Sequence, residues 1–141
     1  MEKLFILKLL LSMLIFSSFQ SVCAAEDLIK SSDKQTTEYW EGKVLTARFR
    51  AGMCFQPNGK AHGVLILTHR NGNEDVYHLY GTYRDSYFDL SHSSGHYFNG
   101  QRTGPDSMEG QVKLSNGMKM KLKGSRKQNV SLKAPDCAPL N

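Results

Sequence analysis

Apolar and polar residues alternate in short runs from Tyr39 onward, and turn residues separate the runs. The runs recur about every 8–12 residues, a spacing typical of consecutive short β-strands. Over residues 43–50, Leu45, Ala47 and Phe49 alternate with polar side chains. This pattern predicts a first strand with one apolar and one cationic face.

Two of the four Asn-Gly dipeptides predict tight hairpins. Asn71-Gly72 separates an apolar run at 63–68, interpreted as a central strand, from a run at 76–80. Asn116-Gly117 separates 108–114 from 118–123. In the last run every second residue is a lysine and the intervening residues are apolar, so we expect an amphipathic strand. The apolar residues are Met118, Met120 and Leu122, and the cationic ones are Lys119, Lys121 and Lys123.

These elements predict an all-β fold of six to eight antiparallel strands. Because most connections are short, we expect a small antiparallel up-and-down β-barrel, with a two-sheet β-sandwich as the alternative. The stretch from Ser91 to Pro105 contains three glycines and is expected to be irregular. A cluster of aromatic residues in the middle hairpins is expected either to pack in the core or to line a barrel mouth: Tyr77, Tyr80, Tyr83, Tyr87, Phe88, Tyr97 and Phe98.

The N-terminus has the three-part layout of a secretory signal peptide. A lysine follows the first two residues, an apolar run extends to Phe16, and small residues precede Ala25. We therefore expect a signal peptide at 1–25, a flexible polar leader at 26–38 and a single β domain at 39–141. No transmembrane span is expected once the signal is removed.

Cys54 and Cys137 are the two cysteines that follow the expected signal. Export to an oxidising compartment makes a disulfide between them the expected state. The bridge would tie the proline-containing C-terminal tail to the β domain. We expect a periplasmic or secreted protein.

Positive charge concentrates near the C-terminus. The chain has a formal net charge of +5, and residues 110–135 contain no acidic residue. The basic face expected from this segment consists of Lys113, Lys119, Lys121, Lys123, Arg126 and Lys127. Outside the cytoplasm such a face suits an anionic lipid, an acidic glycan or an acidic protein, rather than a nucleic acid. The alternative is that the lysines protect a strand at the edge of a sheet from pairing with other chains.

Histidines offer a second, weaker candidate site. His92 and His96 flank Ser93-Ser94-Gly95, and the candidates for a third ligand to a metal ion are His78, His69 and Asp89. The spacing lacks the helix and the glutamate of a typical zinc motif. No serine, carboxylate or nucleotide-binding motif indicates catalysis, so neither an enzyme nor a cofactor is expected. The leading expectation is an exported, non-enzymatic binding or accessory domain that contacts an anionic envelope component or a partner protein. A barrel that binds a small ligand or a metal is the alternative, and an enzyme comes third.

Overall fold

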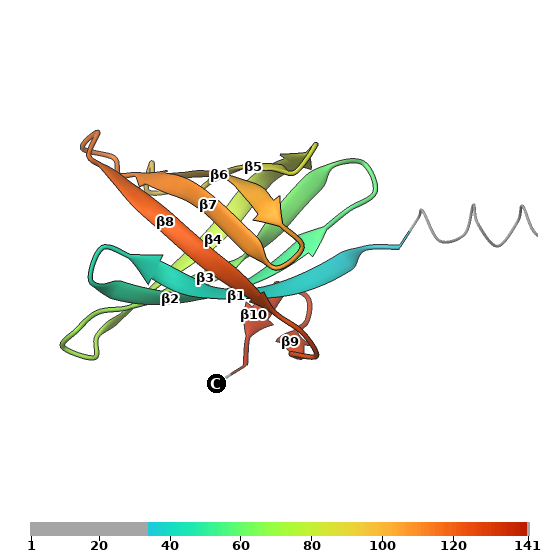
Figure 1. Ribbon diagram of the computed structural model, residues 1–141, viewed down its shortest axis with the longest axis horizontal. Helices are drawn as coiled ribbons and strands as arrows, with labels where there is room; N and C mark the ends of the chain where they lie inside the picture. The colour runs from blue at the N-terminus through green and yellow to red at the C-terminus, as the bar shows by residue number, and fades with distance from the viewer. Residues whose placement is uncertain (1–33, 141) are drawn as a thin grey trace, which may run out of the picture. The chain divides into compact units, whose positions relative to one another are not determined.

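Eight antiparallel strands pair in chain order and close into a barrel (Figure 1). The computed structural model describes residues 34–140. The barrel strands are β1 (Thr36–Val44), β2 (Ala47–Phe55), β3 (Lys60–Thr68), β4 (Glu74–Arg84), β5 (Tyr87–Ser91), β6 (Tyr97–Gly104), β7 (Ser107–Lys113) and β8 (Lys119–Lys127). No helix occurs among the described residues. The expected signal peptide lies outside them.

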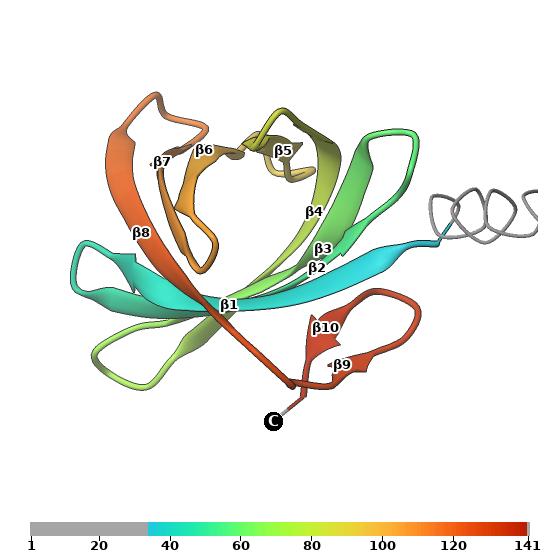
Figure 2. The ribbon, with the colours of Figure 1, turned by 45° about the vertical axis from the view of Figure 1, so that its right-hand side comes forward.

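Pairing between the first and the last strand closes the barrel. In β1 and β8, Tyr39 lies opposite Lys127 and Val44 lies opposite Leu122. Figure 2 shows β8 crossing β1 where the sheet meets itself. The fold is therefore the expected antiparallel barrel and not the β-sandwich. Within residues 34–140 there is also no helix of the length and apolarity needed to cross a membrane.

Alternate residues of each strand fill the interior, as the period of two predicts. Trp40 of β1, Leu79 of β4 and Leu122 of β8 are all buried in one core. In β8 the intervening lysines are exposed, which confirms the amphipathic pattern of this strand.

The prediction of one strand over residues 43–50 is wrong, because a tight turn interrupts this segment. β1 ends at Val44 and β2 begins at Ala47. Leu45, at the tip, has a positive φ of 53° and is 70% exposed. A leucine disfavours this left-handed conformation, so the sequence carries no ordinary turn signal here. The strand β1 also begins at Thr36, inside the segment that was expected to be a polar leader.

The prediction of an irregular stretch at 91–105 is also wrong, because β6 occupies most of this segment. Phe98 and Arg102 of β6 point into the barrel, with Gly100 between them. Gly100 lies opposite Gly110 of β7. Because a glycine and an arginine occupy inward positions, this strand lacks the alternation of apolar and polar residues from which a strand is predicted.

The C-terminal tail forms a short hairpin, β9 (Leu132–Lys133) and β10 (Ala138–Pro139), that packs on the outside of β2 and β3. The expected disulfide between Cys54 and Cys137 holds it there, with Cα atoms 5.9 Å apart. Cys54 lies within β2 rather than in a loop. A Cβ atom on Gly52 would stand 1.8 Å from the carbonyl oxygen of Cys137, so glycine is required for this close approach.

Candidate functional site

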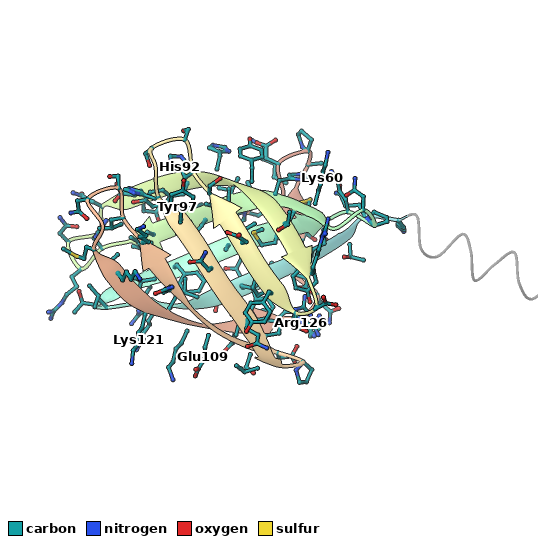
Figure 3. The ribbon with its side chains drawn as sticks, turned by 90° about the horizontal axis from the view of Figure 1, so that it is seen from above. Lys60, His92, Tyr97, Glu109, Lys121 and Arg126 are labelled. Carbon is teal, nitrogen blue, oxygen red and sulfur yellow. A yellow bond between two sulfur atoms is a disulfide. The ribbon has the colours of Figure 1, made fainter. Side chains whose placement is uncertain are left out.

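The outer surface of β7, β8, β1 and β2 carries a group of cations that we call the basic face. Its members come from alternate, outward positions of four adjacent strands and are all exposed. They are Lys43, Arg48, Lys113, Lys119, Lys121 and Lys123. Figure 3 shows Lys121, together with Glu109 of β7, projecting away from the barrel.

The register places like charges directly opposite each other on this face. Lys123 of β8 lies opposite Lys43 of β1, and Lys43 lies opposite Arg48 of β2. Lys113 of β7 lies opposite Lys119 of β8. Directly opposed like charges destabilise a sheet because their side chains are only about 5 Å apart at Cβ. The arrangement therefore does not serve the stability of the fold.

Acidic partners for these cations are few. The Nζ atom of Lys123 donates to Oε1 of Glu109 over 2.7 Å, with both side chains exposed. In the part of the chain that the structure describes, the other members of the basic face form no ion pair. Their charges are thus directed at solvent.

Protection of a sheet edge does not explain these lysines. β8 pairs with β7 on one side and with β1 on the other, so it has no free edge. Closing a barrel removes its edges altogether.

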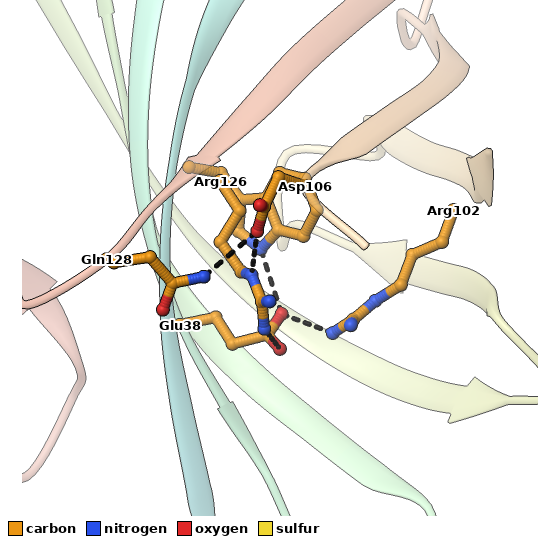
Figure 4. A network of polar contacts seen from close by, with 6 residues as sticks. Glu38, Arg102, Asp106, Arg126 and Gln128 are labelled. Atoms are coloured by element: carbon orange, nitrogen blue, oxygen red, sulfur yellow. Dashed lines mark hydrogen bonds and ion pairs between the residues drawn. The ribbon is translucent and has the colours of Figure 1, made fainter. Parts of the chain in front are cut away.

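Arg126 does not lie on the basic face, although the sequence placed it there. Its guanidinium lies in a network of polar contacts inside one barrel mouth (Figure 4). Nη1 of Arg126 donates to Glu38 of β1 over 3.1 Å, and Nε donates to Asp106 over 2.9 Å. Lys127 is exposed, but it lies opposite Tyr39, further along β8 than the opposed cations.

Glu38 is the centre of this mouth network. Its side chain is 10% exposed, accepts hydrogen bonds from Arg102 and Arg126, and also accepts one from Nε1 of Trp40 over 3.1 Å. The guanidinium of Arg102 lies 5.1 Å from the ring centre of Tyr83, within cation–π distance. The network thus consists of charges that are paired with one another and is suited to closing the mouth rather than to binding a charged ligand.

The same contacts shift two pKa values. The hydrogen bond from Arg126 lowers the pKa of Asp106, with a further contribution from Gln128. In return, Asp106 raises the pKa of Arg126, and the charge of Glu38 adds to this shift. Both shifts favour the ionised pair.

The histidine loop lies at β5 and β6, where Tyr77 of β4 contacts both His92 and His96. Nδ1 of His92 accepts a hydrogen bond from the backbone N–H of Ser94 over 3.2 Å. Nδ1 of His96 accepts a hydrogen bond from the backbone N–H of Ser115 over 3.1 Å. In the neutral rings this places the proton on Nε2, so a metal ion at Nε2 would have to move the proton to Nδ1 and break the hydrogen bond there.

The structure does not bring His78 to this loop as a third ligand. His78 lies instead with His62 and Asp136 in a surface groove beside the C-terminal hairpin. Among the described residues, the three-membered cluster of possible metal ligands is Cys54, His62 and Cys137, whose ligand atoms lie within 4.8 Å of one another. Both cysteines are in the disulfide, which leaves His62 as the free ligand of the three.

The barrel interior holds a cavity of only about 50 Å³, walled by core side chains such as Trp40, Leu79 and Phe98. Sites for small molecules usually measure about 300–1,000 Å³. Of the seven aromatic residues in the middle hairpins, Tyr77, Tyr83, Phe88 and Phe98 face inward and fill the mouths and core, whereas Tyr80, Tyr87 and Tyr97 are exposed on the outer surface.

Two cations of the basic face, Lys43 and Arg48, were not assigned to it from the sequence. They belong to the expected first strand, whose cationic side was recognised, but they are about 65 or more residues before the C-terminal lysines in the chain. Only the pairing of β1 with β8 brings the two segments together, and no local pattern signals this pairing.

Comparisons of the chain with protein families, with curated proteins and with solved structures find no match.

Proposed function

We propose that this protein is an exported, non-enzymatic binding domain that attaches to an anionic component of the cell envelope through the basic face. The observation that carries the proposal is the row of directly opposed cations, Lys123, Lys43 and Arg48, on three neighbouring strands. The row destabilises the sheet and protects no edge, and a ligand that neutralises its charges accounts for its presence.

Two further features support this function. The basic face lies on strands that are paired on both sides, so the cations are held on a rigid surface. The disulfide agrees with an oxidising compartment, where the cell envelope offers anionic lipids and glycans. The filled interior favours this function over a barrel that encloses a small ligand.

The experiment uses vesicles made of anionic and zwitterionic phospholipid at low ionic strength. The test variant replaces Lys119, Lys121 and Lys123 by Glu, and the control variant replaces Lys60, Arg84 and Lys133 by Glu. All six side chains are exposed, so both variants should fold, and both change the net charge equally.

Each basic side chain near an anionic surface contributes about 1 kcal/mol to binding. The partition coefficient of the test variant between vesicles and solution should therefore be lower by about 100-fold or more. The control variant should retain most of its binding. Equal losses in the two variants would indicate a response to net charge alone and would contradict a localised site.

A further inference from the structure

A shallow groove of about 520 Å³ adjoins the basic face on the outer surface of β5–β8. Two rows of outward side chains border it. One row contains Asn99, Gln111 and Lys121, which lie opposite one another on β6, β7 and β8. The other row contains Tyr87, Gln101, Glu109 and Lys123 on β5 to β8.

Main chain forms the floor of the groove between the two rows. Gly100 and Gly110 lie opposite each other there, and both line the groove. A Cβ on Gly110 would stand 2.2 Å from the carbonyl oxygen of Asn99, so the two strands approach closely only with glycine at this position. The volume of the groove is within the range of ligand sites.

Several polar groups in the groove have no partner in the protein. Within residues 34–140, the side-chain amides of Gln101 and Gln111 make no hydrogen bond to another side chain or to the backbone. Each amide offers two donor hydrogens and an acceptor oxygen. Tyr87 is 57% exposed and presents an aromatic ring at one end of the second row.

We propose that this groove binds an acidic saccharide, a sugar chain that carries carboxylates. The apolar face of a sugar ring stacks on an aromatic ring such as Tyr87. Amides bind vicinal hydroxyl groups because they donate and accept side by side. Lys121 and Lys123 form the wall between this groove and a second one that contains Lys43, so a carboxylate on the sugar meets the basic face directly.

The composition of the groove favours a saccharide over a lipid surface or an acidic peptide. A lipid surface needs apolar side chains to insert, and Tyr87 is the one large apolar side chain exposed in the groove. An acidic peptide would use the lysines and could pair its backbone with the amides, but its acidic side chains offer no ring face to stack on Tyr87. Glu109, neutralised by Lys123, remains an acceptor for a sugar hydroxyl.

This inference rests on the proposed function, so its test measures the two separately. The probes are a galacturonic acid oligomer, the same oligomer with its carboxylates methyl-esterified, and a polyglutamate peptide of matched charge. Binding is measured by calorimetry at low ionic strength on the full exported chain. The variants are Tyr87→Ala, Gln101→Ala with Gln111→Ala, and Tyr80→Ala as a control, because Tyr80 is 61% exposed on β4 outside the groove.

The wild type should bind the uronate oligomer more tightly than polyglutamate and should bind the methyl ester weakly. Tyr87→Ala should weaken uronate binding by about tenfold. The variant with Gln101→Ala and Gln111→Ala should bind the uronate oligomer more weakly by a comparable factor. Tyr80→Ala should bind it like wild type. None of these variants should lose retention on anionic vesicles.

Equal affinity of the wild type for uronate and polyglutamate, or unchanged uronate binding by Tyr87→Ala, would overturn the saccharide inference and leave the anionic function standing. Absence of wild-type binding to the uronate oligomer would overturn it too. Vesicle retention that is the same for the wild type and the triple glutamate variant would instead remove the proposed function itself.

Discussion

Glu38 of β1 accepts a hydrogen bond from Arg126 of β8, 88 residues further along the chain, and so joins the two strands that close the barrel. Arg102 of β6 contacts the other carboxylate oxygen. One carboxylate therefore bridges two guanidinium groups at the mouth, and Asp106 supplies the second negative charge through its pair with Arg126. Glu38 thus adds side-chain contacts to the backbone pairing that closes the barrel.

Glu38→Gln should destabilise the protein by about 2–4 kcal/mol, because it leaves two partly buried arginines facing each other without the intervening charge. Chemical denaturation measures the change. The matched control is Glu109→Gln, which removes an exposed pair with Lys123 and should leave stability nearly unchanged. Similar effects of the two substitutions would contradict a structural role for the mouth network.

Gly52→Ala should detach the C-terminal hairpin, because the added methyl group would collide with the carbonyl of Cys137. We expect a clear fall in melting temperature and faster amide exchange in β9 and β10. Gly104→Ala is the control, since the nearest atom to its new methyl group is the movable hydroxyl of Ser107 at 2.9 Å. If amide exchange in β9 and β10 is as slow in Gly52→Ala as in wild type, the close packing of the hairpin on Gly52 is contradicted.

Asp106 should make stability depend on pH at the acid end. Its pKa in the folded protein is lowered below the ordinary value of 3.8 by the hydrogen bond from Arg126. Because the pKa of Asp106 is lower in the folded than in the unfolded protein, its ionised carboxylate stabilises the fold fully above pH 3.8. This contribution is lost as the pH falls through the folded pKa. The difference in melting temperature between wild type and Asp106→Asn should therefore shrink below pH 3.8. A difference that stays constant down to the lowest pH would rule out this linkage.

The histidine loop should not bind zinc or copper tightly, because Nδ1 of both His92 and His96 already accepts a backbone N–H. Calorimetry with each ion should show no submicromolar site. Tight binding that disappears on replacing both histidines by alanine would show that the rings turn to present a free nitrogen, and would return metal binding to the leading alternatives.

The sequence predicts those parts of the fold that local patterns encode. The turns at Asn71-Gly72 and Asn116-Gly117 and the alternation of Lys119 to Lys123 specify hairpins within about 15 residues of chain. The turn at Leu45 escapes prediction because a leucine adopts a positive φ there, and β6 escapes because Gly100 and Arg102 occupy inward positions.

The candidate site is predicted only in part, for a different reason. Alternation shows that Lys119, Lys121 and Lys123 share one face of a strand, but it does not show which strand lies beside them. The position of Lys43 opposite Lys123 depends on closure of the barrel. Arg126 and Lys127 lie beyond the strand expected at 118–123, but β8 continues to Lys127, and its alternation turns Arg126 inward and Lys127 outward.

The salt dependence of vesicle binding tests the central claim, attachment through the basic face, most directly. The screening length falls from about 30 Å at 0.01 M salt to about 10 Å at 0.1 M. Wild-type retention on anionic vesicles should fall steeply over this range. The variant with Lys119, Lys121 and Lys123 changed to Glu should bind weakly throughout. Retention by wild type that is independent of salt, or equal to that of the triple variant at every salt concentration, would contradict the claim.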